Sequence, residues 1–521
     1  MTESAPRQAA AIAGATAAAV SLGVAELASG ASRTIPSLVV SVGDLVIDYA
    51  PFGIVEGAIS IFGTNDKKAL IVGTVVLAVL LGSALGRASI ARPRAARAGF
   101  GAFGLLGAIA AWRQHDASTL LPALAAGVAV AAGVATLGVL LWVHRRATEP
   151  GAATTQAVDR RAFLGLAGAG VVVGSAAALA GARWRRRFRV EGARQAVRLP
   201  SPVRADADLA PAAITGVEDL TPLVTPNDRF YRIDTAILVP QVEPDSWTLE
   251  VGGRVDRPFE LTYAELLDLP MVEEYVTLAC VSNEVGGKLV GTAKWLGVPL
   301  AEILDRAGLR RDAQQVVGRS VDGFTVGFPI EAVADGRTAL VAVGMNGEPL
   351  PVVHGFPARL VVAGLYGYVS ATKWLSEIEL TAWDDFDAYW IPRGWAKEAP
   401  VKTQSRIDVP RGGRTLAPGL VTIAGVAWAP HRGITRVEVS INGDDWQHAE
   451  LSGETPADVW RQWRFAWDAT AGDHTIAVRA TDADGRAQTA ERSPPPPDGA
   501  TGHHTIRVRV GAALAASRPR D

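Results

Sequence analysis

The sequence of 521 residues contains a single cysteine, Cys280. One thiol excludes an intramolecular disulfide, a zinc-finger cage and a cysteine-ligated iron–sulfur cluster. The motif C-x-x-C-H is also absent, so a covalently attached haem of that type is excluded. We therefore expect no haem and no iron–sulfur cluster. The net charge of −2 shows no excess of basic residues, which argues against nucleic acid as a partner.

Charged residues are scarce and unevenly spread. They make up 20% of the chain, against about 25% in a typical soluble domain. Residues 1–150 hold only 19 of them, and the remaining 371 residues hold 85. The first third therefore has the composition of a membrane protein, and the rest has that of a globular protein.

Five apolar stretches approach or exceed the about 20 helical residues that cross a bilayer. They are residues 8–25, 69–86, 98–112, 117–143 and 162–182. Residues 35–62 are apolar too, but they contain Asp44, Asp48 and Glu56. Each carboxylate at the bilayer centre costs about 2.5–3.5 kcal/mol. We expect residues 35–62 to be interfacial or re-entrant, with a sixth span as the alternative.

Arginines predict the orientation of these spans, because cytoplasmic loops are rich in Arg and Lys. The loop after the second span holds four arginines, whereas the next loop holds only Arg113. The loop before the last span again holds four, namely Arg145, Arg146, Arg160 and Arg161. This pattern places residues 184–521 on the extracytoplasmic side of the cell membrane, although five further arginines lie at 183–189.

The arginine pair at the last span offers an explanation for that conflict. Arg160 and Arg161, followed by Phe163-Leu164 and a Gly/Ala-rich helix, resemble a twin-arginine export signal, which carries folded cargo. The alternative is a plain cytoplasmic anchor. No A-x-A site follows Ala182, so we expect the helix to remain as an anchor.

The pattern along the chain predicts four parts: a multi-span membrane domain over 1–184, a linker over 185–215, a mixed α+β domain over 216–398, and an all-β domain over 399–515. The α+β domain has predicted helices at 263–269 and 300–307, the first with Thr262 and Glu265 as a capping box. Residues 400–409 are expected to be a second linker. Strand-like runs at 420–427, 434–441, 460–467, 475–480 and 505–510, with an Asn442-Gly443 turn, favour an immunoglobulin-like β-sandwich.

Cys280 ends an apolar run and precedes Ser282, Asn283 and the pair Gly286-Gly287. A lone cysteine is usually a small buried hydrophobic residue. Here the loop that follows can bring backbone close to a ligand, and a soft thiolate suits a transition metal.

Three blocks of sequence resemble the sulfite oxidase family. The first runs over residues 277–300 through Cys280 and Trp295-Leu-Gly-Val-Pro-Leu300. The second runs from Met345-Asn-Gly-Glu-Pro through His354-Gly-Phe-Pro-Ala-Arg359 to Lys373-Trp374. The third, over residues 225–234, resembles the family's first pterin-contacting segment. The resemblance covers residues 216–512 and none of the α-helical membrane domain that the composition predicts. It implies a mixed α+β sulfite-oxidase-type molybdopterin-binding domain and an immunoglobulin-like β-sandwich of the family's dimerisation type.

The resemblance also implies a cofactor, molybdenum-molybdopterin, and the residues that hold it. Cys280 would be the protein ligand of molybdenum, and Arg232 would lie at the metal as a second catalytic residue. Arg359 and Lys373 would bind the pterin phosphate, and His354 a pterin edge. The further cofactor contacts that it implies are Phe230, Tyr231, Asp234 and Asp322.

One departure bears on the substrate. Sulfite oxidases carry arginines four and five residues after the ligand cysteine, where this chain has Glu284 and Val285. We expect a membrane-tethered oxidoreductase that transfers oxygen atoms at a sulfur centre. We also expect its activity on sulfite to be poor. The alternatives are a methionine-sulfoxide-type or N-oxide reductase and, in another class, a non-catalytic membrane receptor or scaffold. The expected partners are membrane lipid, a small-molecule or sulfoxide substrate and a separate electron carrier or quinone; a homodimer stays open.

Overall fold

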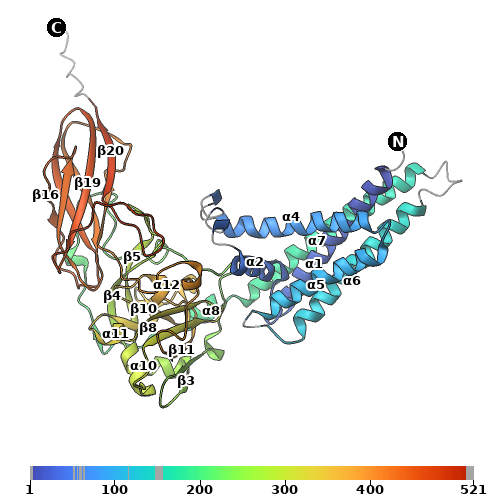
Figure 1. Ribbon diagram of the computed structural model, residues 1–521, viewed down its shortest axis with the longest axis horizontal. Coiled ribbons are helices and arrows are strands. Elements are labelled where there is room, and N and C mark those ends of the chain that lie inside the picture. The colour runs from blue at the N-terminus through green and yellow to red at the C-terminus, as the bar shows by residue number, and fades with distance from the viewer. Residues whose placement is uncertain are drawn as a thin grey trace, which may run out of the picture. The chain divides into compact units, whose positions relative to one another are not determined.

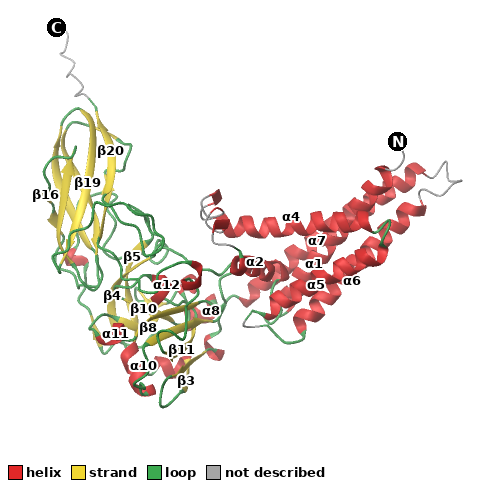
Figure 2. Ribbon diagram, in the orientation of Figure 1, coloured by secondary structure: helices red, strands yellow, loops and turns green. Residues whose placement is uncertain are grey.

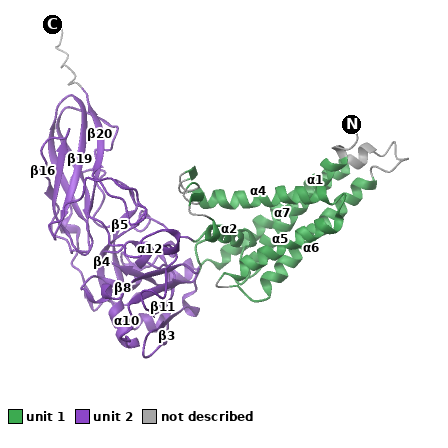
Figure 3. Ribbon diagram, in the orientation of Figure 1, with its two compact units in different colours: residues 1–189, 236–241 green, residues 190–235, 242–521 purple. Residues whose placement is uncertain are grey.

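The computed structural model describes residues 4–50, 53–54, 57, 61–62, 65–114, 117–146 and 156–511. The chain forms two compact units (Figure 3). Unit 1 comprises residues 1–189 and 236–241, and unit 2 comprises residues 190–235 and 242–521. Unit 1 is built from helices, whereas unit 2 carries the sheets (Figure 2).

Within its described residues, unit 1 contains five helices that are long and apolar enough to cross a membrane. They are α1 (Ser4–Ala31), α4 (Asp66–Ala88), α5 (Pro93–Trp112), α6 (Leu121–Arg146) and α7 (Gln156–Arg185). Each overlaps one of the predicted spans, so the five helices are confirmed as helices. Helix α1 packs against α4, α6 and α7 and forms the centre of the bundle (Figure 1).

Glycines let α1 approach two of its neighbours closely. A β-carbon added to Gly14 would lie 2.7 Å from the α-carbon of Gly86 in α4. A β-carbon on Gly23 would lie 2.7 Å from the α-carbon of Gly174 in α7, and one on Gly30 2.6 Å from the oxygen of Gly181. Small residues at such contacts permit backbone packing that larger side chains would prevent.

The end of α1 explains part of the arginine cluster at 183–189. Arg185 forms an ion pair with Glu26 at 2.7 Å. Arg187 donates to the carbonyl oxygens of Gly30 and Ala31, at 3.1 and 2.7 Å. These carbonyls end a helix and carry partial negative charge, which a cation stabilises. Two of the five arginines therefore have structural partners at one end of the bundle.

The doubtful segment at 35–62 begins with a short helix, α2 (Leu38–Tyr49), of 12 residues. The side chain of Ser37 caps its N-terminus by accepting a hydrogen bond from Val40 N at 3.3 Å. Twelve helical residues span only about 18 Å, too little for a bilayer core. Much of the segment after Ala50 lies outside the described residues, as does the loop at 147–155 that precedes α7.

The α+β part of unit 2 contains two sheets. One has the strand order β1-β4-β5-β8-β10, with β9 paired to β8, and the other has the order β3-β2-β11-β6-β7. The first sheet's strands are β1 (Arg204–Ala205), β4 (Val272–Ala279), β5 (Val290–Pro299), β8 (Ala339–Met345), β9 (Glu348–Pro349) and β10 (Arg359–Val362). The second sheet's strands are β2 (Thr248–Gly253), β3 (Phe259–Thr262), β6 (Gln315–Ser320), β7 (Thr325–Pro329) and β11 (Leu375–Thr381).

Strand β4 is buried along most of its length and contributes side chains to two apolar clusters. Tyr275 and Ala279 belong to the larger core cluster, whereas Val276 and Leu278 belong to a second cluster that includes Phe230 and Phe356. The second cluster therefore connects β4 to the segments on which most of the predicted site residues lie.

The predicted helices of this domain are confirmed. Helix α9 (Tyr263–Leu267) begins with the expected capping box, in which Thr262 and Glu265 hydrogen-bond each other's backbone N–H. Helix α10 (Leu300–Ala307) has the predicted bounds. Two shorter helices, α11 (Glu331–Ala334) and α12 (Gly367–Ser370), lie on later connections.

The C-terminal part of unit 2 is a sandwich of two sheets, with strand orders β12-β14-β18-β17 and β13-β20-β19-β15-β16. The long strands are β12 (Gln404–Val409), β14 (Gly419–Trp428), β15 (Ile434–Ile441), β18 (Arg461–Ala469), β19 (Gly472–Asp482) and β20 (His504–Val510). The short ones are β13 (Thr415–Leu416), β16 (Gln447–His448) and β17 (Glu450–Leu451). Their inward residues form one apolar cluster, as expected for a β-sandwich.

Both predicted linkers carry secondary structure. Within 185–215 lie α8 (Glu191–Ala196) and β1, which pairs in parallel with β4. Within 400–409 lies β12, which pairs with β14. The sequence did not reveal these elements, because neither segment has a clear hydrophobic period and the first is rich in proline and alanine. A strand that pairs at the edge of a sheet needs little side-chain pattern.

Candidate active site

Cys280 lies directly after β4, at the start of the loop that leads to β5. Its N–H donates to Leu289 O at 2.9 Å, and its carbonyl accepts from Asn283 N at 3.1 Å. Asn283 Oδ1 in turn accepts from Leu289 N at 2.8 Å. The thiol is buried, and burial raises its pKa while hydrogen bonds from Ser282 oppose that rise. The loop thus holds one thiol in a fixed, water-poor place, as the sequence predicted.

Two aromatic residues from the segment at 225–234 lie beside it. The rings of Phe230 and Tyr231 stack with centroids 5.2 Å apart. Burial, and then the charge of the Cys280 thiolate, raise the pKa of Tyr231, whereas the charge of Arg359 opposes the rise. Tyr231 is therefore a neutral phenol within electrostatic reach of both Cys280 and Arg359.

His354 is a buried neutral imidazole. Its Nε2 lies 3.1 Å from Asn227 O, and a carbonyl can only accept, so Nε2 carries the proton. Burial, with the charges of Arg359, Lys373 and Arg232, lowers the pKa of His354 to about 4. Nδ1 is consequently an acceptor at neutral pH, and no hydrogen bond from a described residue reaches it. It is available to a ligand's N–H group.

Arg359 is a buried cation held by neutral partners. Its Nη1 donates to His354 O at 3.1 Å, and its guanidinium lies 4.9 Å from the ring centroid of Trp295. Within the described part of the chain, no carboxylate lies at ion-pair distance from it. Burial lowers the pKa of Arg359 to about 10, so it stays charged at neutral pH. A buried guanidinium without an anion is suited to a ligand phosphate.

Lys373, Asp234 and Arg232 form an ion cluster. Asp234 Oδ2 lies 2.7 Å from Lys373 Nζ and 2.8 Å from Arg232 Nε. Burial lowers the pKa of Lys373 to about 8, although Asp234 acts in the opposite direction. The two cations exceed the one carboxylate, so the cluster keeps a positive charge.

Arg232 belongs to this ion cluster through Asp234. Its side chain is 38% exposed and pairs with Asp234, and among the described contacts none joins it to Cys280. The ion pair with a buried carboxylate two residues away holds it at the Lys373 cluster. A position at the metal stays a prediction.

Asp322 lies near the same ion cluster. Its carboxylate accepts from Phe324 N at 3.1 Å, and burial raises its pKa against the effect of Ser320. The charges of Asp234 and Lys373 both act on it. The structure thus gathers the nine predicted site residues in one region, with His354 and Phe230 in contact at 5.5 Å between ring centroids.

Tyr366 belongs to this region and was missed by sequence reasoning. It precedes α12, and a β-carbon on Gly367 would lie 3.8 Å from the oxygen of Ala279, the residue before Cys280. Burial raises the pKa of Tyr366 to about 12, the Lys402 N–H opposes the rise, and the charge of Cys280 adds to it. The signal in the sequence was a tyrosine between two glycines, Gly364 and Gly367.

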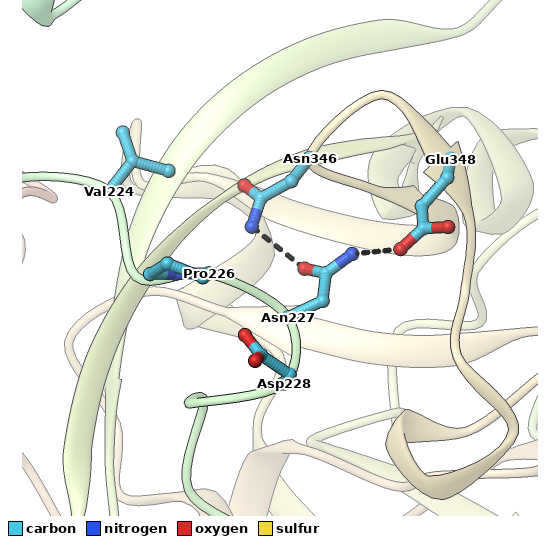
Figure 4. A pocket seen from close by; sticks show the side chains of 6 residues that line it. All are labelled: Val224, Pro226, Asn227, Asp228, Asn346 and Glu348. Atoms are coloured by element: carbon cyan, nitrogen blue, oxygen red, sulfur yellow. Dashed lines mark hydrogen bonds between the residues drawn. The ribbon is translucent and has the colours of Figure 1, made fainter.

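A pocket of about 510 Å³ lies next to the segment at 225–228 (Figure 4). Asn346 donates to Asn227 Oδ1 at 2.7 Å, and Asn227 donates to Glu348 at 2.6 Å. The pocket is also lined by Asp228 and has no cationic side chain in its wall. It is therefore unsuited to a phosphate-bearing cofactor, and this row of amides serves to hold the segment that leads to Phe230.

Comparison with known proteins agrees with this geometry. The family described as "Oxidoreductase molybdopterin binding domain" matches residues 236–390. The uncharacterized oxidoreductase YuiH of Bacillus subtilis (strain 168) is 33% identical over 149 residues, 29% of this chain and 72% of YuiH. Mitochondrial sulfite oxidase of Homo sapiens is 30% identical over 302 residues, 49% of this chain and 55% of that protein. The chain belongs to the sulfite oxidase family of molybdopterin-dependent oxidoreductases.

This sulfite oxidase family member is an enzyme, and molybdenum-molybdopterin is its cofactor. The residues present fit the cofactor, because Arg359 is a buried cation without an anion and His354 has an acceptor nitrogen without a partner from the described residues. Arg359 and Lys373 would hold the phosphate, and Cys280 would bind molybdenum through its thiolate.

The similarity covers only part of each protein. The chain spans about half the length of the sulfite oxidases it matches. Residues 404–478 match the family described as "Bacterial Ig domain", in agreement with the predicted β-sandwich. Among solved structures, the sulfane dehydrogenase SoxCD of Paracoccus pantotrophus has a TM-score of 0.47 and 23% identity, covering 54% of this chain and 76% of that one.

Proposed function

We propose that this enzyme transfers oxygen atoms at a sulfur centre, in a two-electron reaction, on the extracytoplasmic side of a membrane to which unit 1 tethers it. The observation that carries the proposal is the buried Cys280 thiol beside a group of buried cations in a chain of the sulfite oxidase family. Several of the matched relatives are named sulfite oxidases, which supports sulfur as the reacting element.

The residues of the site have distinct tasks in this reaction. Bound molybdenum supplies the oxygen-atom transfer. Cys280 fixes the metal at the end of β4, while Arg359 and Lys373 hold the far end of the cofactor. The neutral phenols of Tyr231 and Tyr366 lie within electrostatic reach of Cys280, and an O–H group there can donate to a substrate oxygen. Burial of this region excludes water from the thiolate.

Glu284 and Val285 support a neutral substrate over sulfite. The Glu284 side chain is exposed on the loop after Cys280, and in the described structure no cation forms an ion pair with it. Its charge therefore repels a dianion that approaches the loop. A sulfoxide or an N-oxide carries no net charge, so reduction of such a compound is the second candidate function.

Unit 1 supports the tether. Its five helices are long enough to cross a bilayer, and their lengths match about 20–30 residues of span. The arginine pattern of the loops favours a position of unit 2 outside the cytoplasm, and Arg160-Arg161 at the start of α7 supports export in a folded state. A separate carrier or a quinone accepts the two electrons when the substrate is oxidised and supplies them when it is reduced.

The test is a measurement of molybdenum in the purified full-length protein, followed by assays with sulfite, sulfoxides and N-oxides and artificial electron carriers. We expect near-stoichiometric molybdenum and turnover of at least one compound. Cys280→Ser keeps the fold but loses the thiolate-to-metal spectral signature and turnover, by more than the roughly 10–100-fold that loss of a supporting residue costs. A protein without molybdenum after correct export would favour the receptor or scaffold function instead.

Export is tested separately with a reporter fused after Asp521. The double change Arg160→Lys and Arg161→Lys should leave the reporter on the cytoplasmic side, because the export receptor reads the arginine pair. A reporter that still reads as external in this variant contradicts the twin-arginine route and leaves the tether intact.

A further inference from the structure

The immunoglobulin-like domain touches the loop that follows Cys280. Gly286 in this loop has a φ of +80°, and a β-carbon placed on it would clash with the imidazole ring of His504 in β20. The ring therefore lies close to the backbone of Gly286, where a β-carbon would have no room. Such a close approach fixes the position of the loop from one side.

His504 is itself held in a single orientation. Its Nδ1 accepts a hydrogen bond from Ile407 N at 2.9 Å, so the proton of the neutral ring is on Nε2. Burial and the charges of Arg406 and Arg492 lower the pKa of His504 to about 4, which keeps the ring neutral at physiological pH. A neutral ring packs against Gly286 without a counter-ion.

Arg406 in β12 makes a second connection to the same loop. Its Nη1 donates to Gly287 O at 2.8 Å, its Nη2 donates to Thr221 Oγ1 at 2.8 Å, and its Nε pairs with Asp408 at 2.6 Å. The side chain is only 7% exposed. A buried arginine with three partners is rigid, so the carbonyl of Gly287 is bound to a fixed point of the β-sandwich.

A third contact lies on the other side of Cys280. The hydroxyl of Tyr366 accepts a hydrogen bond from Lys402 N at 3.4 Å. Gly499 packs against it, since a β-carbon on Gly499 would lie 2.5 Å from that hydroxyl. The β-sandwich and the segments that flank it thus contact both the loop after Cys280 and Tyr366.

We propose that the immunoglobulin-like domain positions the active site, with Arg406 and His504 as positioning residues that hold the Cys280–Leu289 loop against the end of β4. The domain then has a role within each single chain, apart from any role in dimerisation. The proposal concerns the same site as the proposed function, and it deepens that function by naming what sets the geometry of Cys280.

The single cysteine provides a readout that does not depend on molybdenum. In full-length protein purified from cells grown without molybdenum, a maleimide can modify only Cys280. Its rate reports how often the loop opens. We expect Arg406→Gln to raise this rate by about tenfold or more, the effect of losing one hydrogen bond from a charged group. Arg432→Gln is the control, because Arg432 pairs with Asp482 at 3.0 Å and has no described contact with the loop.

A second pair of variants keeps the test independent of whether Arg406→Gln folds. Gly286→Ala should raise the rate of modification, and the same change in a His504→Ala background should raise it much less, because the clashing ring is gone. Equal effects in both backgrounds would overturn the proposal. So would an Arg406→Gln rate within twofold of the Arg432→Gln rate, since the arginine would then act only on general stability.

In protein loaded with molybdenum, Arg406→Gln should also alter the thiolate-to-metal spectral signature, whereas Arg432→Gln should not. Arg406→Lys keeps the charge and should partly restore the wild-type rate of modification. A protein that binds no molybdenum but still shows the expected modification rates would disprove the proposed function and leave this inference standing.

Discussion

The two units of this enzyme bury opposite kinds of residue. In unit 1, glycine and alanine lie at the helix contacts, and large apolar side chains such as Val72, Leu80 and Leu124 are exposed. In unit 2, leucine, valine and tryptophan form the core, and charged residues such as Arg359 and Lys373 are buried beside it. The first arrangement suits an apolar solvent, and the second suits water outside and a charged ligand inside.

This difference predicts which substitutions affect the folding of each unit. Unit 1 depends on the absence of side chains at a few backbone contacts. Unit 2 buries charges at a cost in free energy, and for Arg359, which has no carboxylate partner among the described residues, a bound anion would offset that cost. A substitution that removes a buried charge should therefore separate ligand binding from folding in unit 2, whereas adding a side chain should affect folding in unit 1.

Removal of the buried cation Arg359 should give the largest difference between ligand binding and folding in unit 2. Arg359→Met should lower the molybdenum and pterin content of the purified enzyme by about 10–100-fold, as loss of a residue that supports a metal site does. The midpoint of thermal unfolding of the cofactor-free protein should change little, because the substitution removes a buried charge that has no anionic partner in that state.

Arg319→Met is the matched control for that variant. Arg319 pairs with Glu377 at 3.3 Å on the second sheet, and none of its described side-chain contacts is with a predicted cofactor residue. Its cofactor content should stay at the wild-type level. Equal cofactor loss in both variants would mean that Arg359 acts through the fold and not through the phosphate.

An added side chain tests unit 1. Gly14→Leu should destabilise the bundle by about 1–3 kcal/mol, because the new side chain meets the backbone of α4. Gly127→Leu in α6 should have almost no effect, since nothing described lies within 4 Å of a β-carbon at Gly127. Thermal unfolding of both variants in detergent measures the difference. Similar midpoints would contradict the close packing of α1 on α4.

Charge reversal near the loop has a smaller expected effect. Two unit charges about 4 Å apart would interact by about 4 kcal/mol at an effective dielectric constant of 20. Glu284 is exposed, however, and solvent screening reduces such effects to about 1 kcal/mol or less. We therefore expect Glu284→Arg with Val285→Arg to lower the KM for sulfite about fivefold in steady-state assays. An unchanged KM would show that neither side chain faces the substrate.

The last effect arises only in acidic solution. The pKa of His504 is about 4 in the folded protein and about 6.5 in an unfolded chain, so only the unfolded state binds this proton between these values. Stability should fall as the pH drops from 6.5 to 4, by up to about 1.4 kcal/mol per pH unit from this residue. His504→Gln should reduce that slope of thermal stability against pH. An identical slope would mean that His504 is protonated in the folded state.

Sequence patterns predicted the elements with strong periodicity or composition. The five apolar helices, the capping box of α9 and the bounds of α10 and β15 follow from local chemistry. The place of Cys280 after a buried strand also followed from an apolar run that ends at a polar, glycine-containing loop. These features depend on residues close together along the chain.

Features that depend on distant partners were not predictable. The pairing of β1 with β4 joins residues about 70 positions apart, and no period marks a two-residue strand. Lys373 pairs with Asp234, which lies 139 positions away in the sequence, and no local pattern marks this ion pair. Tyr366 comes close to the site because α12 packs near the end of β4, where a β-carbon on Gly367 would lie 3.8 Å from the oxygen of Ala279. In each case tertiary packing decided the outcome.

The amide row beside the pocket gives the enzyme a chemical weak point. Asn346 and Gly347 form a turn with φ of 53° and 83°, and an asparagine before glycine is the sequence most prone to lose ammonia with time. The product, an aspartate, cannot donate to Thr225 O or Asn227 Oδ1, as the amide now does at 3.0 and 2.7 Å. The segment before Phe230 would loosen, so the age of a preparation limits its capacity to keep the cofactor.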